Sequence, residues 1–400
     1  MLEELEMGPG DTQPGDTRPG DTQRGATGSS ASGGSGGATT SVTPGLSQDP
    51  PDVAELALGI DASCARLTDG TVKCWGSNQD GQLGNGTSVA QSVPVRVQGI
   101  SNATDIAVSG VHACARLSDG TVRCWGKGAQ GQLGLGTTTS YLTPMAVVGL
   151  SSVAEVAISP NHSCARLQDG TVSCWGMNPY GELGDGTKLQ RLFPTRVYAL
   201  ANAVQISVSG DKSCARISDG NLLCWGYNLR GELADGTTQH PYVPVAVKGI
   251  DSLVQVSVGK FDTCVIQKDS SVKCWGSSDF GQVGDEVLAG SIPTMVPALT
   301  GAVQVSVGED IVCVLTTTGR VKCLGSNRYG QLGNGLIERT DPALFVEGLE
   351  GMSEVAAGTH HCCARTKQGV WCWGRSNFGQ RGDGITEDVK PFPVRVPNLP

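Results

Sequence analysis

The sequence has few charged and few aromatic residues. Asp, Glu, Lys and Arg make up 17% of its 400 residues, and Phe, Trp and Tyr make up 5%. The formal net charge is −9, which argues against a nucleic-acid partner, because nucleic-acid binding requires clustered Lys and Arg. No run of 18 consecutive apolar residues occurs, so we expect no membrane span. The opening residues, MLEELEMGPG, are acidic and lack an apolar core, so no signal peptide is visible.

Glycine and cysteine are the residues that the chain has in excess, with 57 glycines and 15 cysteines. Many glycines among few charges indicate many tight turns, which favours an all-β repeat array over helices. So many cysteines are unusual in a reducing compartment. We therefore expect an extracellular or cell-surface location, although no targeting signal supports it.

A period of about 50 residues runs through most of the chain. The first cysteine of each unit recurs at Cys64, Cys114, Cys164, Cys214, Cys264, Cys313 and Cys363. Each unit has a short apolar run, a cysteine hairpin, the pattern WGxNxxGQLGxGT, a variable stretch and a segment similar to PVRVxGL. The apolar segments are too short for helices and predict about four strands per unit. Seven such units favour a closed seven-bladed β-propeller over the alternative, an open β-solenoid.

The stretch HACARLSDGTVRCWGKGAQGQLGLGT (residues 112–137) resembles the regulator of chromosome condensation repeat. The most specific part is the coupling of Trp-Gly to Gly-Gln-Leu-Gly at a fixed distance. The resemblance covers residues 53–400 and implies a seven-bladed propeller. Local departures are Leu324 in place of Trp, Ala234 in place of Gly, GQVGDE without its last Gly, and Arg381 within GQRGDG.

The first 52 residues differ in composition from the repeats. PGDTQPGDTRPGDTQ (residues 9–23) is a five-residue repeat, and a Gly/Ser-rich stretch follows it. Neither segment can bury enough apolar surface to order itself. We therefore expect residues 1–52 to be a disordered linker and residues 53–400 to form the propeller.

Each cysteine pair could belong to a disulfide hairpin, to a metal site or to a set of small buried thiols. Nine residues separate Cys64 from Cys74, whereas zinc sites favour two to four, so we expect no metal. A three-residue loop with Gly70 in the left-handed conformation would place Cys64 opposite Cys74. A two-residue Asp-Gly turn would instead put the two sulfurs on opposite faces. We predict the hairpin disulfides Cys64–Cys74, Cys114–Cys124, Cys164–Cys174, Cys214–Cys224, Cys264–Cys274, Cys313–Cys323 and Cys363–Cys372.

The seventh unit, HHCCARTKQGVWC, breaks the spacing. Eight residues separate Cys363 from Cys372, and nine separate Cys362 from it. The alignment of CAR favours Cys363 as the partner of Cys372, while the spacing favours Cys362. One of the two is left as a free thiol.

Other candidate sites have structural interpretations. GQLGNGT lacks the Lys-Ser/Thr and the helix of a phosphate-binding loop, so it predicts a turn. The recurring tryptophans are expected to pack between blades, and His112, His162 and His361, each two residues before a cysteine, to make structural hydrogen bonds. We identify no catalytic residues and no cofactor.

The stretch after each GxGT varies most, and in a repeat fold such segments gather on one face. Tyr141, Arg191, Phe193, His240 and Tyr242 lie in these stretches, as possible partner-binding residues or as ordinary loop variation. The first functional hypothesis is a monomeric, non-catalytic module that binds a protein partner through one face. The alternative, implied by the family resemblance, is a guanine-nucleotide exchange factor for a small GTPase. An enzyme is the third and weakest possibility.

Overall fold

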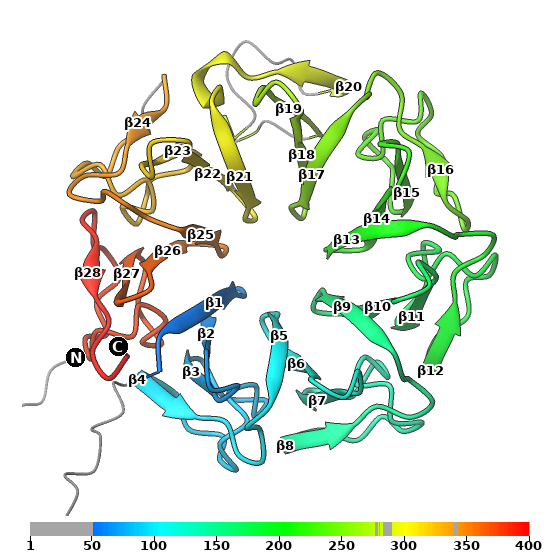
Figure 1. The fold of residues 1–400 in the computed structure, drawn as a ribbon, viewed down its shortest axis with the longest axis horizontal. Helices are drawn as coiled ribbons and strands as arrows, with labels where there is room; N and C mark the ends of the chain where they lie inside the picture. The colour runs from blue at the N-terminus through cyan, green and yellow to red at the C-terminus, as the bar shows by residue number, and fades with distance from the viewer. Residues whose placement is uncertain (1–50, 277–278, 280, 283–289, 340–341, 400) are drawn as a thin grey trace, which may run out of the picture. The chain divides into compact units, whose positions relative to one another are not determined.

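The computed structural model describes residues 51–399 except 277–278, 280, 283–289 and 340–341. Seven four-stranded antiparallel sheets stand around a central channel as the blades of a closed propeller (Figure 1). Every sheet takes its four strands from consecutive positions in the chain. The linker predicted for residues 1–52 falls outside the described residues, apart from Pro51 and Asp52.

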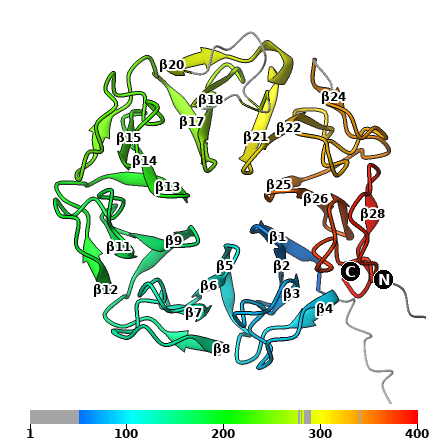
Figure 2. The same cartoon turned by 180° about the vertical axis from the view of Figure 1, so that it is seen from behind.

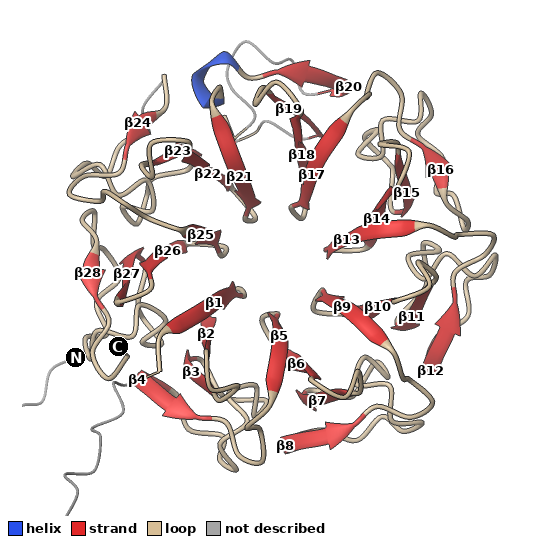
Figure 3. Cartoon of the chain, in the orientation of Figure 1, coloured by secondary structure: helices blue, strands red, loops and turns tan. Residues whose placement is uncertain are grey.

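Strands make up nearly all regular structure in the described residues, as predicted. The one helix among them is the short 3₁₀ segment η1 (Pro297–Leu299), shown in blue in Figure 3. No described helix is long and apolar enough to cross a membrane.

The strands occupy four positions in each blade, from the channel outwards. The inner strands are β1 (Val53–Leu58), β5 (Ala103–Val108), β9 (Val153–Ile158), β13 (Ala203–Ser209), β17 (Leu253–Val258), β21 (Ala302–Val307) and β25 (Glu354–Ala357). The second strands are β2 (Ala62–Leu67), β6 (His112–Leu117), β10 (His162–Leu167), β14 (Lys212–Ile217), β18 (Asp262–Gln267), β22 (Ile311–Thr316) and β26 (His361–Thr366). The third strands are β3 (Val72–Gly76), β7 (Val122–Gly126), β11 (Val172–Gly176), β15 (Leu222–Gly226), β19 (Val272–Gly276), β23 (Val321–Gly325) and β27 (Gly369–Gly374). The outer strands are β4 (Gln91–Arg96), β8 (Tyr141–Ala146), β12 (Arg191–Arg196), β16 (Val245–Ala246), β20 (Gly290–Met295), β24 (Leu344–Phe345) and β28 (Val394–Arg395).

The propeller has two distinct faces. On one face, the turn between the inner and second strands lies beside the connection from the third to the outer strand. In blade 1 a hydrogen bond joins the two segments, since the Ser77 N–H donates to the Asp61 carbonyl over 2.8 Å. We call this the loop face, since it carries the GQLGxGT segments. The opposite face, here the hairpin face, carries the Asp-Gly turns. There Gly70 lies against Asn102, in the connection to the next blade.

The cysteine hairpins of blades 1 to 6 adopt the predicted three-residue loop. In blade 1, Cys64 lies opposite Cys74, and the Leu67 N–H donates to the Thr71 carbonyl. Gly70 has φ +78°, so the turn places it in the left-handed region, which favours glycine. Seven hairpin disulfides are formed, with Cα atoms 4.0–4.2 Å apart.

The structure of blade 7 shows which of Cys362 and Cys363 pairs with Cys372. Its turn is one residue shorter, because Thr366 lies opposite Gly369 with only two residues between them. This shorter loop keeps Cys363 opposite Cys372 despite the reduced spacing, and the two form the disulfide. Cys362 is a buried free thiol.

A repeated tryptophan packs each blade against the one before it. Trp125 is fully buried, and its indole N–H donates to the backbone carbonyl of Gln82 over 2.9 Å. The same bond, to the Gln or Glu of the preceding GQLG, GELG or GELA motif, is made by Trp175, Trp225, Trp275 and Trp373. In blade 6, Leu324 takes this position and is also buried. The predicted packing role of these residues is confirmed.

The ring closes where blade 7 meets blade 1, and β1 and β25 lie side by side in both views (Figures 1 and 2). The Trp75 indole N–H donates to the Gln380 carbonyl over 2.9 Å. Val396, from the C-terminal PFPVRV segment, shares a hydrophobic cluster with Val53 and Leu56. The closure therefore uses the same tryptophan contact as the other blade boundaries. The last strand, β28, pairs with β27 of its own blade and not with a strand of blade 1.

The tryptophan bond gives a stability prediction. Trp175→Phe keeps most of the buried ring but removes the donor to the Gln132 carbonyl, so we expect a loss of about 1–3 kcal/mol in unfolding free energy. The matched control is Trp371→Phe, because Trp371 is only partly buried and lies outside the repeated position. Urea unfolding of both variants tests this, and equal losses would contradict the assigned role.

Candidate binding face and central channel

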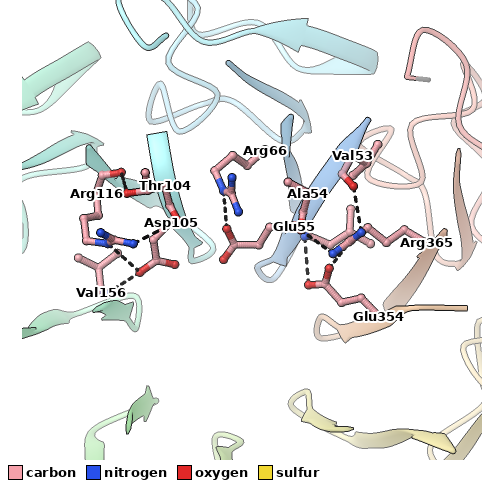
Figure 4. A network of polar contacts seen from close by, with 11 residues as sticks. Val53, Ala54, Glu55, Arg66, Thr104, Asp105, Arg116, Val156, Glu354 and Arg365 are labelled. Carbon is pink, nitrogen blue, oxygen red and sulfur yellow. Dashed lines mark hydrogen bonds and ion pairs between the residues drawn. The ribbon is translucent and has the colours of Figure 1, made fainter. Parts of the chain in front are cut away.

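A belt of ion pairs lines the channel towards the hairpin face (Figure 4). Each pair joins an inner-strand carboxylate to an arginine of the adjacent second strand. Arg66 Nε lies 2.7 Å from Glu55, and Arg166 Nε lies 2.8 Å from Glu155. Arg116 with Asp105 and Arg365 with Glu354 make the equivalent pairs. The four pairs occupy the consecutive blades 7, 1, 2 and 3.

The same belt also joins neighbouring blades. Asp105 Oδ2 accepts the Val156 N–H over 2.9 Å, and Glu354 Oε1 accepts the Leu56 N–H over 3.1 Å, which spans the closure (Figure 4). In blades 4 to 6 the acceptor is an amide, since Gln205, Gln255 and Gln304 accept from the next inner strand. These carboxylates and amides are therefore engaged in holding the ring together.

Burial and the neighbouring Asp105 charge raise the pKa of Glu55 to about 8. The Arg66 guanidinium donates to this carboxyl group and opposes the rise in its pKa. Sequence analysis did not bring these residues together. A signal for them was present in the sequence, because an acid or Gln occupies the third position of the first six inner strands and Glu354 begins the seventh, and CAR recurs in five hairpins.

The channel has an apolar wall near the loop face. Its wall there is formed by apolar residues near the ends of the inner strands, Leu58, Val108, Ile158, Val208, Val258, Val307 and Ala357. These residues line a cavity of about 360 Å³, which is also edged by glycine-containing turns and by the ion pair of Lys260 with Glu309.

The histidines predicted to be structural lie between blades. His112 Nε2 is 2.9 Å from Ser163 Oγ, His162 Nε2 is 2.8 Å from Ser213 Oγ, and His361 Nε2 is 2.7 Å from Ser63 Oγ. Burial lowers the pKa of each of these histidines to about 3. They therefore stay neutral and hydrogen-bonded, as expected for a structural role.

The GQLGxG segments are turns, as predicted. Asn78 organises the first one, because its Oδ1 accepts the Leu83 N–H over 2.9 Å and its Nδ2 donates to the Thr87 and Val89 carbonyls. The first glycine of each motif is covered by the next blade. A Cβ atom on Gly181 would come within 2.5 Å of the Tyr242 ring.

Three of the five predicted partner-binding residues are engaged within the propeller. Tyr141 begins β8 and is partly buried. Arg191 Nε donates to Asp185 Oδ2 over 2.7 Å, which fixes the loop to the start of β12. His240 Nδ1 accepts the Asn228 N–H over 2.9 Å, and its ring stacks on Tyr227 at 5.2 Å.

Phe193 and Tyr242 are the two candidates with large exposed surfaces, at 51% and 36%. The Phe193 ring covers Gly136 of the preceding blade, since a Cβ there would lie 2.3 Å from its Cζ. Lys188 Nζ lies 4.7 Å from the centre of the Tyr242 ring. We call these two side chains the loop-face anchors. Lys188 and the stacked Tyr227 were not among the residues that the sequence singled out.

Glu182 replaces the usual glutamine of the GQLG motif and lies fully buried. At the same position, Gln82 Nε2 donates to the Gly110 carbonyl over 3.0 Å, whereas a glutamate can donate only when protonated. Glu182 Oε1 has no hydrogen-bond partner, and burial raises the pKa of this carboxyl to about 8.

Glu182→Gln is therefore expected to stabilise the propeller at alkaline pH. The folded state holds the Glu182 proton up to about pH 8, and the unfolded chain releases it near pH 4.5, so stability falls as pH rises between these values. We expect a gain of about 1–3 kcal/mol at pH 8, shrinking towards pH 5. The reciprocal variant Gln132→Glu should lose stability with the same pH dependence. Urea unfolding at both pH values measures this, and a pH-independent effect would refute it.

The model of the RCC1-like domain matches residues 19–286, and the RCC1 repeat model matches residues 302–331 and 353–380. No curated protein matches the chain. Among solved structures, human WBSCR16 is 23% identical, with a TM-score of 0.71 over 79% of this chain and 88% of that one.

Two further structures have the same fold. Yeast RCC1 (Prp20), solved with Kap60, is 22% identical, with a TM-score of 0.70 over 87% of this chain and 85% of that one. The ectodomain of the Arabidopsis thaliana receptor kinase ACR4 is 20% identical, with a TM-score of 0.52 over 87% of this chain and 98% of that one. At these identities the similarity establishes the fold alone.

Proposed function

Because the chain belongs to the RCC1-like domain family, we propose that it is a non-catalytic propeller that binds a protein partner through its loop face. The observation that supports the proposal is the exposure of Phe193 and Tyr242, which lie in the variable stretches of the adjacent blades 3 and 4. Aromatic side chains of this kind are enriched among the residues that dominate binding energy at protein interfaces.

Both anchors are held in place before any partner arrives. Phe193 precedes Pro194 within β12 and rests on Gly136, and Tyr242 follows Pro241 and rests on Gly181. A side chain that is already fixed loses little conformational entropy on binding, which favours affinity. The loop face therefore offers rigid apolar contacts rather than flexible loops.

The polar groups support a binding role over catalysis. His112, His162 and His361 are buried and hydrogen-bonded between blades, which removes them as acid–base groups. The channel carboxylates are paired with arginines or accept backbone N–H groups.

An extracellular or cell-surface location fits the seven disulfides, because such bonds persist in oxidising compartments. The receptor-kinase propeller that shares this fold is likewise an ectodomain. We propose that the partner is a protein of the same compartment.

Nucleotide exchange on a small GTPase is the competing function, since the yeast structure is of a protein described as binding Gsp1p and histones. The first cysteines recur every 49 or 50 residues, which leaves no room for a long insertion between repeats. We expect the chain not to accelerate nucleotide release from small GTPases. Accelerated release would replace the proposed function.

The binding test uses the full chain as bait in envelope and medium fractions of its own organism. With the captured protein, Phe193→Ala and Tyr242→Ala should each weaken affinity by at least about thirty-fold, the loss typical of an interface hot spot of about 2 kcal/mol.

The matched control is Phe392→Ala. Phe392 also precedes a proline, lies at the corresponding position of blade 7 and is 46% exposed. Affinity should change little in this variant, and thermal melting should show that all three variants fold. Unchanged affinity in both anchor variants would place the interface elsewhere.

A further inference from the structure

The free thiol of Cys362 lies against a disulfide of the neighbouring blade. Its Sγ is 3.7 Å from Cys313 Sγ, and the three sulfurs of Cys313, Cys323 and Cys362 lie within 4.8 Å of one another. Cys313 and Cys323 form the hairpin disulfide of blade 6, whereas Cys362 belongs to β26 of blade 7. All three are at most 1% exposed, within one hydrophobic cluster.

This contact follows from the architecture of the ring. The residue before the first cysteine of a hairpin points towards the disulfide of the preceding blade. Ser213, which holds the same position in blade 4, lies 4.0 Å from Cys164 Sγ of blade 3. The corresponding residues of blades 1 to 6 are Ser63, Ala113, Ser163, Ser213, Thr263 and Val312. Blade 7 alone has a sulfur there.

We propose that Cys313, Cys323 and Cys362 form a centre for intramolecular thiol–disulfide exchange, whose second state has a Cys313–Cys362 bond between blades 6 and 7. The Cys362 thiolate bonds to Cys313 Sγ, and the Cys313–Cys323 bond breaks with its electron pair on Cys323. Cys323 takes up one proton in place of the one that Cys362 released. The number of disulfides is unchanged, so the step needs no oxidant or reductant.

The surroundings make this exchange slow. Burial raises the pKa of the Cys362 thiol and so disfavours the thiolate that attacks. The compact triangle of sulfurs also places Cys362 beside the Cys313–Cys323 bond rather than on its extension, so its side chain must rotate for in-line displacement. Exchange therefore accompanies a transient loosening between blades 6 and 7.

The two states differ in what the bond holds together. In the first, the bond closes the hairpin of blade 6, with a sequence separation of 10 residues. In the second, it spans 49 residues and joins two blades covalently. The exchange thus converts a cross-link between two strands of one blade into a cross-link between two neighbouring blades.

Peptide mapping of the full-length oxidised protein tests the proposal. After incubation at pH 8.5 and acid quenching, the free thiol is alkylated in denaturant at low pH, and unreduced peptides are analysed by mass spectrometry. We expect alkylated Cys323 and the linked Cys313–Cys362 peptides to rise together with time. Cys362→Ser, which copies the residue of blade 4, should abolish both species. Alkylation that stays confined to Cys362 in the wild type would overturn the proposal.

A pair of matched variants tests the geometry independently. Cys323→Ala leaves Cys313 beside Cys362, and with oxidised glutathione as oxidant these two should pair, leaving no free thiol. Cys274→Ala removes the same kind of hairpin bond in blade 5, but Cys264 then faces Val312, so Cys264 and Cys362 should both remain unpaired with other protein cysteines. An unpaired Cys313 in folded Cys323→Ala would also overturn the proposal. If neither variant folds, the wild-type mapping decides.

Discussion

The propeller depends on the contact in which one blade receives the tryptophan of the next. The indole enters beside the second glycine of the GQLG motif, where a Cβ on Gly84 would lie 2.6 Å from Trp125 Nε1. The same motif offers the backbone carbonyl that accepts the indole N–H. The propeller ring is therefore stabilised by the large buried apolar surface of the indole, and the one polar atom of the indole, Nε1, is hydrogen-bonded. Trp-Gly and Gly-Gln-Leu-Gly recur together because they are two sides of one blade boundary.

The polar contacts beside this apolar packing distinguish the boundaries from one another. Buried His–Ser pairs lie at the boundaries of blades 2 with 3, 3 with 4 and 7 with 1. At the boundary of blades 4 and 5, buried Lys212 donates instead to the Asp262 carbonyl over 2.9 Å. Burial lowers the pKa of Lys212 and raises the pKa of Asp262, and the attraction between the two groups opposes both shifts. A blade placed beside the wrong neighbour would leave such buried groups unpaired, at a cost in free energy.

Much of the fold was predictable because its determinants are local. The left-handed glycine of the Asp-Gly turn sets the hairpin register, and the register places Cys64 opposite Cys74. The pairing in blade 7 depended on the length of one turn, which the sequence alone left open. Once Thr366 pairs with Gly369, the antiparallel register places Cys363 opposite Cys372.

The contacts between blades could not be predicted because their partners lie about one repeat apart, and the exposure of single loop residues could not be predicted either. Asp105 and Val156 meet only after two blades pack. Arg191 and Phe193 looked equally suitable as contact residues, yet the first is engaged by Asp185 and the second stays exposed. The exposure of a side chain depends on how its loop folds against its own blade, and the residue type alone does not predict this.

The boundaries of the sheets coincide with the boundaries of the repeats, since every sheet is completed by four consecutive strands. A propeller that closes by exchanging a strand between its ends is tied to a fixed blade number, because the terminal sheet needs both ends of the chain. In this chain a gene segment coding for one repeat corresponds to one finished blade. If such a segment were duplicated or deleted, every remaining strand would still have its neighbours in its own sheet. The number of blades is thus constrained by how the sheets pack around the ring, because no strand is shared between the ends of the chain.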